Sequence, residues 1–524
     1  MAIKRYIATK DNTITNAYKT DLSTRATGSN MGGADILETF SIYAQASSGS
    51  TELSRILIKF PISDITTDRS NSVIPGSGSV NFYLRMFNAR HAETLPRNLK
   101  LVVSAIASGS WDEGHGMDMD EYTDETHNAT GSNWINYTSG TAWTSVGGDY
   151  YTDASSSFTV SFDKGNEDLE LNVTQLVEQW LSASTAISPT DDSNLGSKAN
   201  YGVGIYVTSS QEAYFSASTG TASGSVPHNP AGSKFSYYTK KFFGKSTEFF
   251  FKRPLIEARW DSTKKDDRSS FYYSSSLAPP ADNLNTLYLY NYIRGQLRNI
   301  PGIDAGSPIY VNLYSGSSGN KIPPSGAALV MSVGGDVPVV NQPATGGWVA
   351  TGIYSASIAV TAAASPLTKL FDVWSSGTTQ YHTGVISPIT LDSSNTNPSQ
   401  RYITSITNLR DTYSREETAR FRLFSRKKDW SPTIYNVATS EVKSSIIESG
   451  SYSIRRVIDD LVVVQYGTGS DLHTQLSFDV SGSYFDFDMA MLESGYAYGL
   501  KFAYYNGAIG DWVEQPDIFK FRVD

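Results

Sequence analysis

The stretch "SRILIKFPI" at residues 54–62 carries the clearest structural pattern in the sequence. Every second residue is apolar, which predicts a β-strand with one buried face, because strand side chains alternate between two sides. The opposite face carries Arg55 and Lys59, but Leu57 interrupts it, so we expect that face to be partly covered as well. The residues of the apolar face are Ile56, Ile58, Phe60 and Ile62.

Similar runs recur along the whole chain and are separated by Gly, Ser, Asn and Pro. The 524 residues include 32 Tyr and 23 Phe, and strand-forming residues dominate. Short strands between turn residues are typical of β-sandwiches, and we predict an all-β fold. The clearest further runs are "VNFYLRMF" (80–87), "LKLVVSAI" (99–106), "SSFTVSFD" (156–163) and "YGVGIYVT" (201–208).

The composition argues against several classes of protein. The formal net charge is −10, whereas a protein that coats nucleic acid needs clustered Lys and Arg. The chain has no cysteine, which excludes disulfides and thiolate metal sites. We find no signal peptide at the N-terminus and no apolar run of the roughly 18 residues that a membrane-spanning helix needs. We therefore expect neither a nucleic-acid nor a membrane partner.

One segment, 172–183, has the spacing of a helix rather than a strand. Its apolar residues recur at intervals of three and four, which predicts one buried helical face. Asn172 or Thr174 can cap the helix by accepting a hydrogen bond from a free backbone N–H. The residues of the apolar face are Val173, Leu176, Val177, Trp180 and Leu181.

The sequence suggests three sandwich domains, since 524 residues exceed what one core usually holds. We predict a first domain at 1–262, with a long polar loop at 110–155. A linker at 263–285 precedes a β-sandwich at 286–395, and an immunoglobulin-like β-sandwich follows at 396–524.

Four motifs in residues 1–260 resemble the DNRLRE-type β-sandwich, a jelly-roll module of bacterial surface proteins related to carbohydrate-binding modules. "SRILIKFPISDI" resembles that family's "R-x-L-L-x-F-D-L-S-x-I" strand, with Pro61 in place of the usual Asp. "SGSWDEGHG" resembles its "W-x-E-G-x-G" segment through Trp111, Glu113, Gly114 and Gly116. "LELNVTQLVEQWL" is similar to its helix and "KRPLIEARW" to its closing strand. The resemblance implies a jelly-roll-like first domain. The size of the two later domains, roughly 110 to 130 residues each, fits immunoglobulin-like sandwiches.

Most of the chain also resembles virion structural proteins of marine tailed phages, including cyanophages. The similar segments include "YYTKKFFGKSTEFFFKRPLIEARWDS" and "SGYAYGLKFAYYNGAIGDWVEQPDIFKFRVD". This resemblance implies a component of the virion, assembled in the host cytoplasm, whose partners are other virion structural proteins and copies of itself.

We find no sequence motif for catalysis. The six histidines form neither H-x-H nor H-E-x-x-H, and the chain lacks a G-x-S-x-G elbow and phosphate-binding loops. We therefore expect no enzymatic activity and no cofactor.

A cation site is one hypothesis for the acidic part of the loop. Calcium takes six to eight oxygen ligands, and a loop rich in carboxylates can supply them. The alternative is a solvated acidic loop. The candidate calcium ligands are Asp112, Glu113, Asp118, Asp120 and Glu121.

The aromatic residues of the loop are candidates for glycan binding. An aromatic ring can stack on the apolar face of a sugar while nearby polar groups bind its hydroxyls. Alternatively, these rings hold the loop against the sandwich or fill a contact between subunits. The candidates are Trp134, Tyr137, Trp143 and Tyr150.

The segment "YSREETARFRLFSRKKDW" is a basic patch in an acidic protein. Arg and Tyr are enriched at protein interfaces, so this patch and "SGYAYGLKFAYYNG" form a candidate docking surface. The alternative is a solvated face balanced by Glu416 and Glu417. The interface candidates are Arg420, Arg422, Tyr496, Tyr498 and Tyr504.

These observations favour a non-enzymatic virion structural protein. We expect a peripheral neck, tail or baseplate component that docks as a multimer, whose weak contacts gain affinity by acting together. The alternatives are a glycan-binding adhesin for host attachment and a capsid decoration protein.

Overall fold

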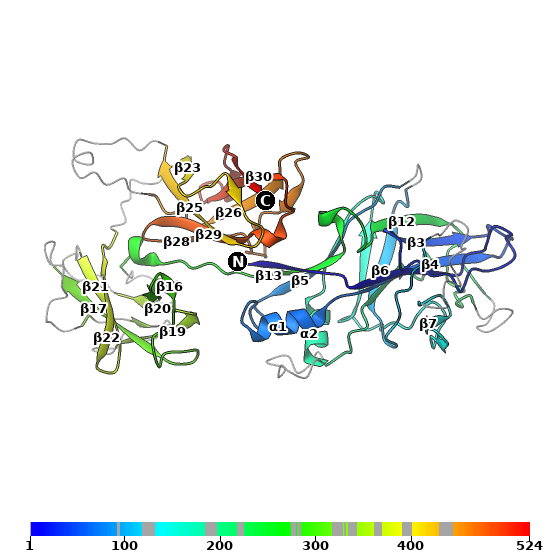
Figure 1. Ribbon diagram of the computed structural model, residues 1–524, viewed down its shortest axis with the longest axis horizontal. Coiled ribbons are helices and arrows are strands. Elements are labelled where there is room, and N and C mark those ends of the chain that lie inside the picture. Colours follow the sequence, from blue (N-terminus) through cyan, green and yellow to red (C-terminus); the bar gives the residue numbers. More distant parts are fainter. Residues whose placement is uncertain are drawn as a thin grey trace. The chain divides into compact units, whose positions relative to one another are not determined.

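The structure is a computed structural model of the whole chain (Figure 1). It describes residues 2–91, 95–117, 131–183, 196–216, 225–273, 279, 284–316, 328–329, 332–333, 343–360, 369–389, 401–428 and 444–524. The chain forms two compact units. The N-terminal unit comprises Ala2–Asp261 together with Asp471–His473, and the C-terminal unit comprises Ser262–Ser470 and Thr474–Asp524. Both are built of β-sheets, which confirms the predicted all-β sandwich class.

The N-terminal unit is a sandwich of two mostly antiparallel sheets around one large core. The smaller sheet has the order β1 (Ile3–Ile7), β13 (Leu255–Arg259), β5 (Asn81–Met86), β10 (Leu169–Asn172). The larger sheet has the order β12 (Tyr237–Phe243), β3 (Ile36–Tyr43), β4 (Thr51–Lys59), β11 (Val203–Val207), β6 (Leu99–Ala105), β9 (Ser157–Phe162), and β2 (Lys10–Thr15) pairs with β4. Outside these sheets lie the hairpin of β7 (Asn136–Thr138) and β8 (Thr141–Ala142) and the 3-10 helix η2 (Phe250–Lys252).

Strand β4 lies within the larger sheet and is covered on both faces. Ile56 and Ile58 face the core between the two sheets, whereas Leu57 belongs to a second core that includes Trp111 and Trp134. The strand ends at Lys59, because Pro61 has no backbone N–H to continue the ladder. Ile62 was expected on the strand, but it is the first residue of helix α1 (Ile62–Ser70), which was not predicted from the sequence.

The predicted helical segment forms helix α2 (Thr174–Ala183). Its apolar face is buried in the large core, where Trp180 is 2% exposed. Asn172 accepts a hydrogen bond of 3.0 Å from the backbone N–H of Thr174. Helices α1 and α2 lie side by side (Figure 1), and Arg69 binds both oxygens of Glu178 at 2.6 and 2.7 Å.

The C-terminal unit begins with a seven-stranded sheet that surrounds its own core. Its order is β14 (Asn285–Tyr290), β20 (Ile353–Ala359), β19 (Ala344–Ala350), β17 (Ile309–Gly316), β21 (Lys369–Ser376), β22 (Thr379–Ile386), and β18 (Ser332–Val333) pairs with β20. Strands β15 (Tyr292–Ile293) and β16 (Gln296–Leu297) form a hairpin. The suggested linker at 263–285 contains the 3-10 helix η3 (Asp267–Ser269) and Phe271, which is fully buried in this core.

Two further sheets of the C-terminal unit enclose a core rich in aromatic rings. The rings of Tyr452 and Phe485 stack with centroids 4.1 Å apart, and Phe421 stacks on the same Phe485 at 5.0 Å. One sheet has the order β23 (Tyr402–Ile406), β25 (Thr418–Lys427), β29 (Gly482–Asp488), β28 (Ser477–Asp479). The other has the order β24 (Thr412–Tyr413), β32 (Phe519–Val523), β30 (Ala497–Asn506), β26 (Gly450–Arg456), β27 (Val462–Val464), and β31 (Asp511–Glu514) pairs with β30. The 3-10 helix η6 (Met489–Met491) follows β29.

Among the described residues, no helix is long and apolar enough to cross a membrane.

Candidate functional site

The acidic loop places its described carboxylates in contacts with the protein itself. Asp112 accepts a hydrogen bond from the hydroxyl of Thr138. Glu113 accepts one of 2.8 Å from the backbone N–H of Asp11 and lies 3.2 Å from the Nζ of Lys245. In the described part of the chain, no group of three or more His, Cys, Asp or Glu residues is arranged to hold a metal. The other three calcium candidates, Asp118, Asp120 and Glu121, lie outside the described residues.

The "W-x-E-G-x-G" segment folds around the side chain of Asn30. Its amide donates hydrogen bonds of 2.7 Å to the carbonyls of Glu113 and Ser132. Gly114 has a φ of +80°, and a Cβ there would lie 2.1 Å from the Asn30 side chain. A Cβ on Gly116 would lie only 1.3 Å from the Asn30 carbonyl oxygen. The glycines of this motif therefore allow close backbone packing.

Asp11 lies fully buried beside this segment. Its Oδ2 accepts a hydrogen bond of 2.5 Å from the backbone N–H of Lys245, whereas its Oδ1 has no partner among the described residues. Burial raises the pKa of Asp11 to about 7, and the nearby charge of Glu113 acts in the same direction. The carboxyl group therefore titrates near neutral pH.

The four glycan-binding candidates do not form an exposed platform. Trp134 is 0% exposed and Trp143 is 5% exposed, and both belong to the second core of the N-terminal unit. Tyr137 and Tyr150 are half-buried and pack against the same core. A sugar needs an open ring face, so in this structure the buried indoles hold the loop on the sandwich instead.

The side chain of Arg55 contacts several rings of this aromatic cluster. The guanidinium of Arg55 lies 5.3 Å from the ring of Trp134 and 4.9 Å from that of Tyr206. It also pairs with Glu212 at 2.9 Å. The strand face that carries Arg55 was expected to be partly covered, and Trp134 of the loop lies against it as a cation–π partner.

The interface candidates are also largely occupied within the C-terminal unit. Arg420 binds both oxygens of Asp486 at 2.7 and 2.9 Å, and Arg422 binds those of Asp479 at 2.9 and 2.7 Å. Their charges are therefore balanced by carboxylates of the same sheet, on β29 and β28.

The three tyrosines of the same prediction differ in exposure. Tyr498 is 0% exposed and its hydroxyl donates to the carbonyl of Glu493 at 2.8 Å. Tyr504 is 3% exposed and its hydroxyl lies 2.8 Å from that of Thr404. Tyr496 is half-buried, with Arg456 lying 4.9 Å from its ring. Tyr498 and Tyr504 are therefore core residues, which corrects their assignment to a docking surface.

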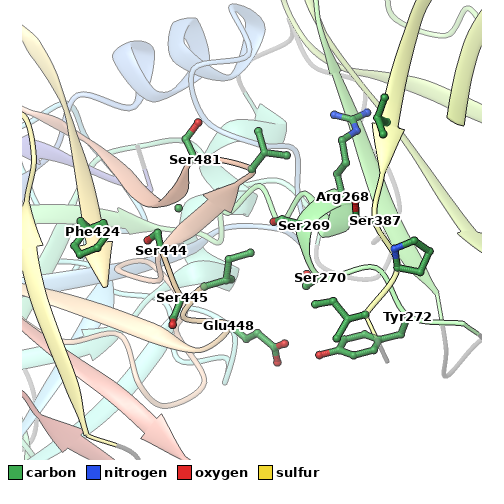
Figure 2. Close-up of a pocket in the computed structure, with 16 residues that line it drawn as sticks. Arg268, Ser269, Ser270, Tyr272, Ser387, Phe424, Ser444, Ser445, Glu448 and Ser481 are labelled. Atoms are coloured by element: carbon green, nitrogen blue, oxygen red, sulfur yellow. The ribbon is translucent and has the colours of Figure 1, made fainter. Parts of the chain in front are cut away.

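A groove of about 950 Å³ lies in the C-terminal unit (Figure 2). It is lined by four chain segments, 268–272, 385–389, 444–448 and 480–482, together with Phe424. The lining combines serine hydroxyls, aliphatic side chains, Tyr272 and the carboxylate of Glu448. This groove is a candidate binding site.

Backbone hydrogen bonds hold the groove's walls in place. The N–H of Ile389 donates to the carbonyl of Phe271 at 2.8 Å, which joins two lining segments. On the other wall, the N–H of Ser445 donates to the carbonyl of Ser425 at 2.6 Å. Gly482 has a φ of +117°, and a Cβ there would lie 2.9 Å from the carbonyl oxygen of Leu423 and 3.0 Å from the hydroxyl of Ser444. The absence of a side chain at position 482 therefore lets this corner of the wall pack closely against Leu423 and Ser444.

The positive charge of Arg268 is neutralised beside the groove. Its guanidinium donates hydrogen bonds of 2.6 Å to Asp372, which is fully buried, and of 3.3 Å to Asp266. Burial raises the pKa of Asp266 to about 6, and the charge of Arg268 opposes that rise. The Arg268 cation is thus committed to the wall rather than to a ligand.

This groove was not predicted from the sequence. Its serines come from segments spread over more than 200 residues, and an isolated serine in a polar loop carries no distinguishing signal. Phe424 of β25 and Gly482 of β29 line the same groove as Ser269 of η3 only because of tertiary packing.

Comparisons with known proteins add little to this geometry. No protein-family model matches the sequence. No curated protein matches it either. A crystal structure of Salmonella alpha-2-macroglobulin reacted with methylamine aligns with 9% sequence identity and a TM-score of 0.14. The alignment covers 100% of this chain and 34% of that chain, so this chain spans about a third of its length. This likeness is too low to bear on fold or function.

Proposed function

We propose that the chain is a non-enzymatic structural protein of a tailed-phage virion, at the neck, tail or baseplate. In this role it docks to other virion proteins and to copies of itself. The proposal combines the resemblance of the sequence with an architecture of packed β-sandwiches.

The observation that carries the proposal is the dense internal bracing of the sandwiches without any disulfide. In the N-terminal unit, the first strand pairs with the last strand, and buried Glu257 lies among three arginines. In the C-terminal unit, Arg420 and Arg422 clamp strand β25 to Asp486 and Asp479. Such ion pairs, fixed on strands, favour a rigid part over a mobile one.

Exposed apolar side chains supply surfaces for docking. Phe235 and Ile458 are 78% and 77% exposed, and Val480 is 61% exposed. A single exposed apolar residue is ordinary on a protein surface. In a multimer, however, each such residue is present once per copy, and the weak contacts of all copies act together. This supports docking through several small patches.

The glycan-binding site suggested for the adhesin alternative is not exposed, because Trp134 and Trp143 are buried. The ion pairs and the exposed apolar side chains support a capsid decoration protein as well as a neck, tail or baseplate component. A reconstruction of the intact particle distinguishes these positions directly.

Mass spectrometry of purified particles tests the proposal. Particles of the phage that encodes the chain are banded on a density gradient and digested with trypsin. We expect peptides from both units at a fixed ratio to the major capsid protein across the band. Recovery of the chain only from the soluble lysate, away from the particles, would contradict the proposal.

A further inference from the structure

The groove of the C-terminal unit carries an unbalanced negative charge. Glu448 lines it and is exposed, and no lysine or arginine of the described residues forms an ion pair with it. Figure 2 shows its carboxylate and the ring of Tyr272 on opposite sides of the opening. Burial raises the pKa of Tyr272, and the charges of Glu448 and Asp267 add to this effect. A cationic group in the groove would therefore find an attractive field.

The groove also offers hydrogen-bonding groups that its own walls do not use. The hydroxyl oxygen of Ser269 is buried and has no partner among the described residues. Ser387, Ser445 and Ser481 contribute further hydroxyl groups to the lining. Hydroxyls both donate and accept, so they suit the alternating N–H and C=O groups of an extended backbone.

Aliphatic side chains complete the lining. Val480 is 61% exposed, Val385 is 46% exposed and Ile389 is 39% exposed, and all three face the groove. They come from both walls, since Val385 and Ile389 flank the end of β22 and Val480 lies between β28 and β29. Apolar side chains of a ligand would bury these surfaces.

We propose that this groove binds an extended peptide segment of a partner protein, with a lysine or arginine between apolar residues. The basic side chain would pair with Glu448, the apolar side chains would cover the aliphatic walls, and the backbone would bond to the serines. This inference rests on the proposed docking function and specifies the chemistry of one partner. An uncharged polysaccharide would leave both the Glu448 charge and the aliphatic walls without a complement.

Binding of synthetic peptides to the full-length chain tests the inference. The probes are three dye-labelled nonapeptides that share a Ser-Val-Thr-Val framework and carry Lys, Gln or Glu at the central position. Fluorescence anisotropy gives the dissociation constant at low and at high salt. We expect the Lys peptide to bind at least tenfold more tightly than the Glu peptide, with a difference that shrinks as salt screens the pair.

Three variants locate the binding. Glu448→Gln removes the groove charge and should abolish the preference for Lys, whereas Glu416→Gln changes an exposed glutamate outside the lining and should preserve it. Ser481→Trp fills the groove from an exposed position, and it should weaken binding of the Lys peptide at least tenfold. Circular dichroism of each variant confirms that the fold is retained.

Equal affinity for the Lys and Glu peptides would overturn the inference, as would a Ser481→Trp variant that binds normally. Binding of a neutral glycan in place of the peptides would also overturn it. These results are distinct from the particle analysis. A chain found in particles whose groove ignores basic peptides would refute only the groove assignment.

Discussion

Arg5 on β1 donates a hydrogen bond of 2.7 Å from its Nε to Glu257 on β13, which joins residues 252 positions apart. Glu257 also accepts from the Nε of Arg259 at 2.7 Å and from Arg85 at 3.2 Å. Glu257 is 2% exposed, and the three arginines hold its pKa far below the ordinary range despite the opposing effect of burial. One carboxylate therefore ties together three neighbouring strands of the smaller sheet.

Replacing Glu257 with Gln should strongly destabilise the N-terminal unit. The change leaves Arg5, Arg85 and Arg259 close together without a central anion, and breaking a buried pair in this way typically costs about 3 to 5 kcal/mol. Hydrogen exchange of peptides from β1 and β13, measured in full-length protein at increasing urea, gives the loss. Glu170→Gln is the control, because Glu170 pairs with Arg259 from a more exposed position and should cost about 1 kcal/mol or less. Equal effects of both variants would contradict this account.

Asp11→Asn should stabilise the protein at pH 8 but not in acid. Because burial raises the folded-state pKa of Asp11 to about 7, above its unfolded value, the folded state holds the extra proton. The contribution of the Asp11 carboxyl group to the free energy of unfolding is therefore fully present at low pH, and it is lost as pH rises from about 4 to about 7. The charges of Glu113 and Asp35 also raise the pKa of Asp11, whereas Lys245 lowers it.

Thermal melts of the wild-type chain and the Asp11→Asn variant at pH 4.5 and pH 8 test this prediction. The gain in the free energy of unfolding should be about 2 to 4 kcal/mol at pH 8, and about 1 kcal/mol or less at pH 4.5. A gain that does not change with pH would show that Asp11 is already ionised in the folded state at low pH.

Gly116→Ala should prevent normal packing of the loop. The added methyl group would lie 1.3 Å from the carbonyl oxygen of Asn30, a backbone atom that cannot move aside alone. We expect a loss of about 3 kcal/mol or more, or failure to fold. Gly49→Ala is the matched control, since nothing lies within 4 Å of its Cβ position. Limited proteolysis and thermal melts compare the two variants, and similar melting temperatures would contradict the predicted clash.

Trp180→Ala should empty a large site in the core of the N-terminal unit. The indole of Trp180 lies on the buried face of α2, and truncating a buried aromatic residue costs about 3 to 5 kcal/mol. Gln175→Ala on the exposed side of the same helix should change stability by about 0.5 kcal/mol or less. Urea unfolding measures both, and an unchanged midpoint for Trp180→Ala would show that α2 does not pack as described.

The sequence by itself determined the fold class and several local elements. The period-two pattern at 54–62 marks β4, and the three-and-four spacing at 172–183 marks α2, because each periodicity reflects which side of an element is buried. It did not reveal α1, whose polar residues obscure the helical period. It also did not reveal where β4 ends relative to Ile62.

Only the tertiary structure decided what the candidate residues do. The sequence identified Trp134, Tyr498 and Arg420 as notable, but not that the two rings are buried or that Arg420 is paired with Asp486. The groove likewise required four distant segments to meet. The physical reason is the separation along the chain over which each feature is determined. The local sequence pattern indicates whether a side chain faces inward or outward, whereas its contact partner depends on strand pairing between residues that are hundreds of positions apart.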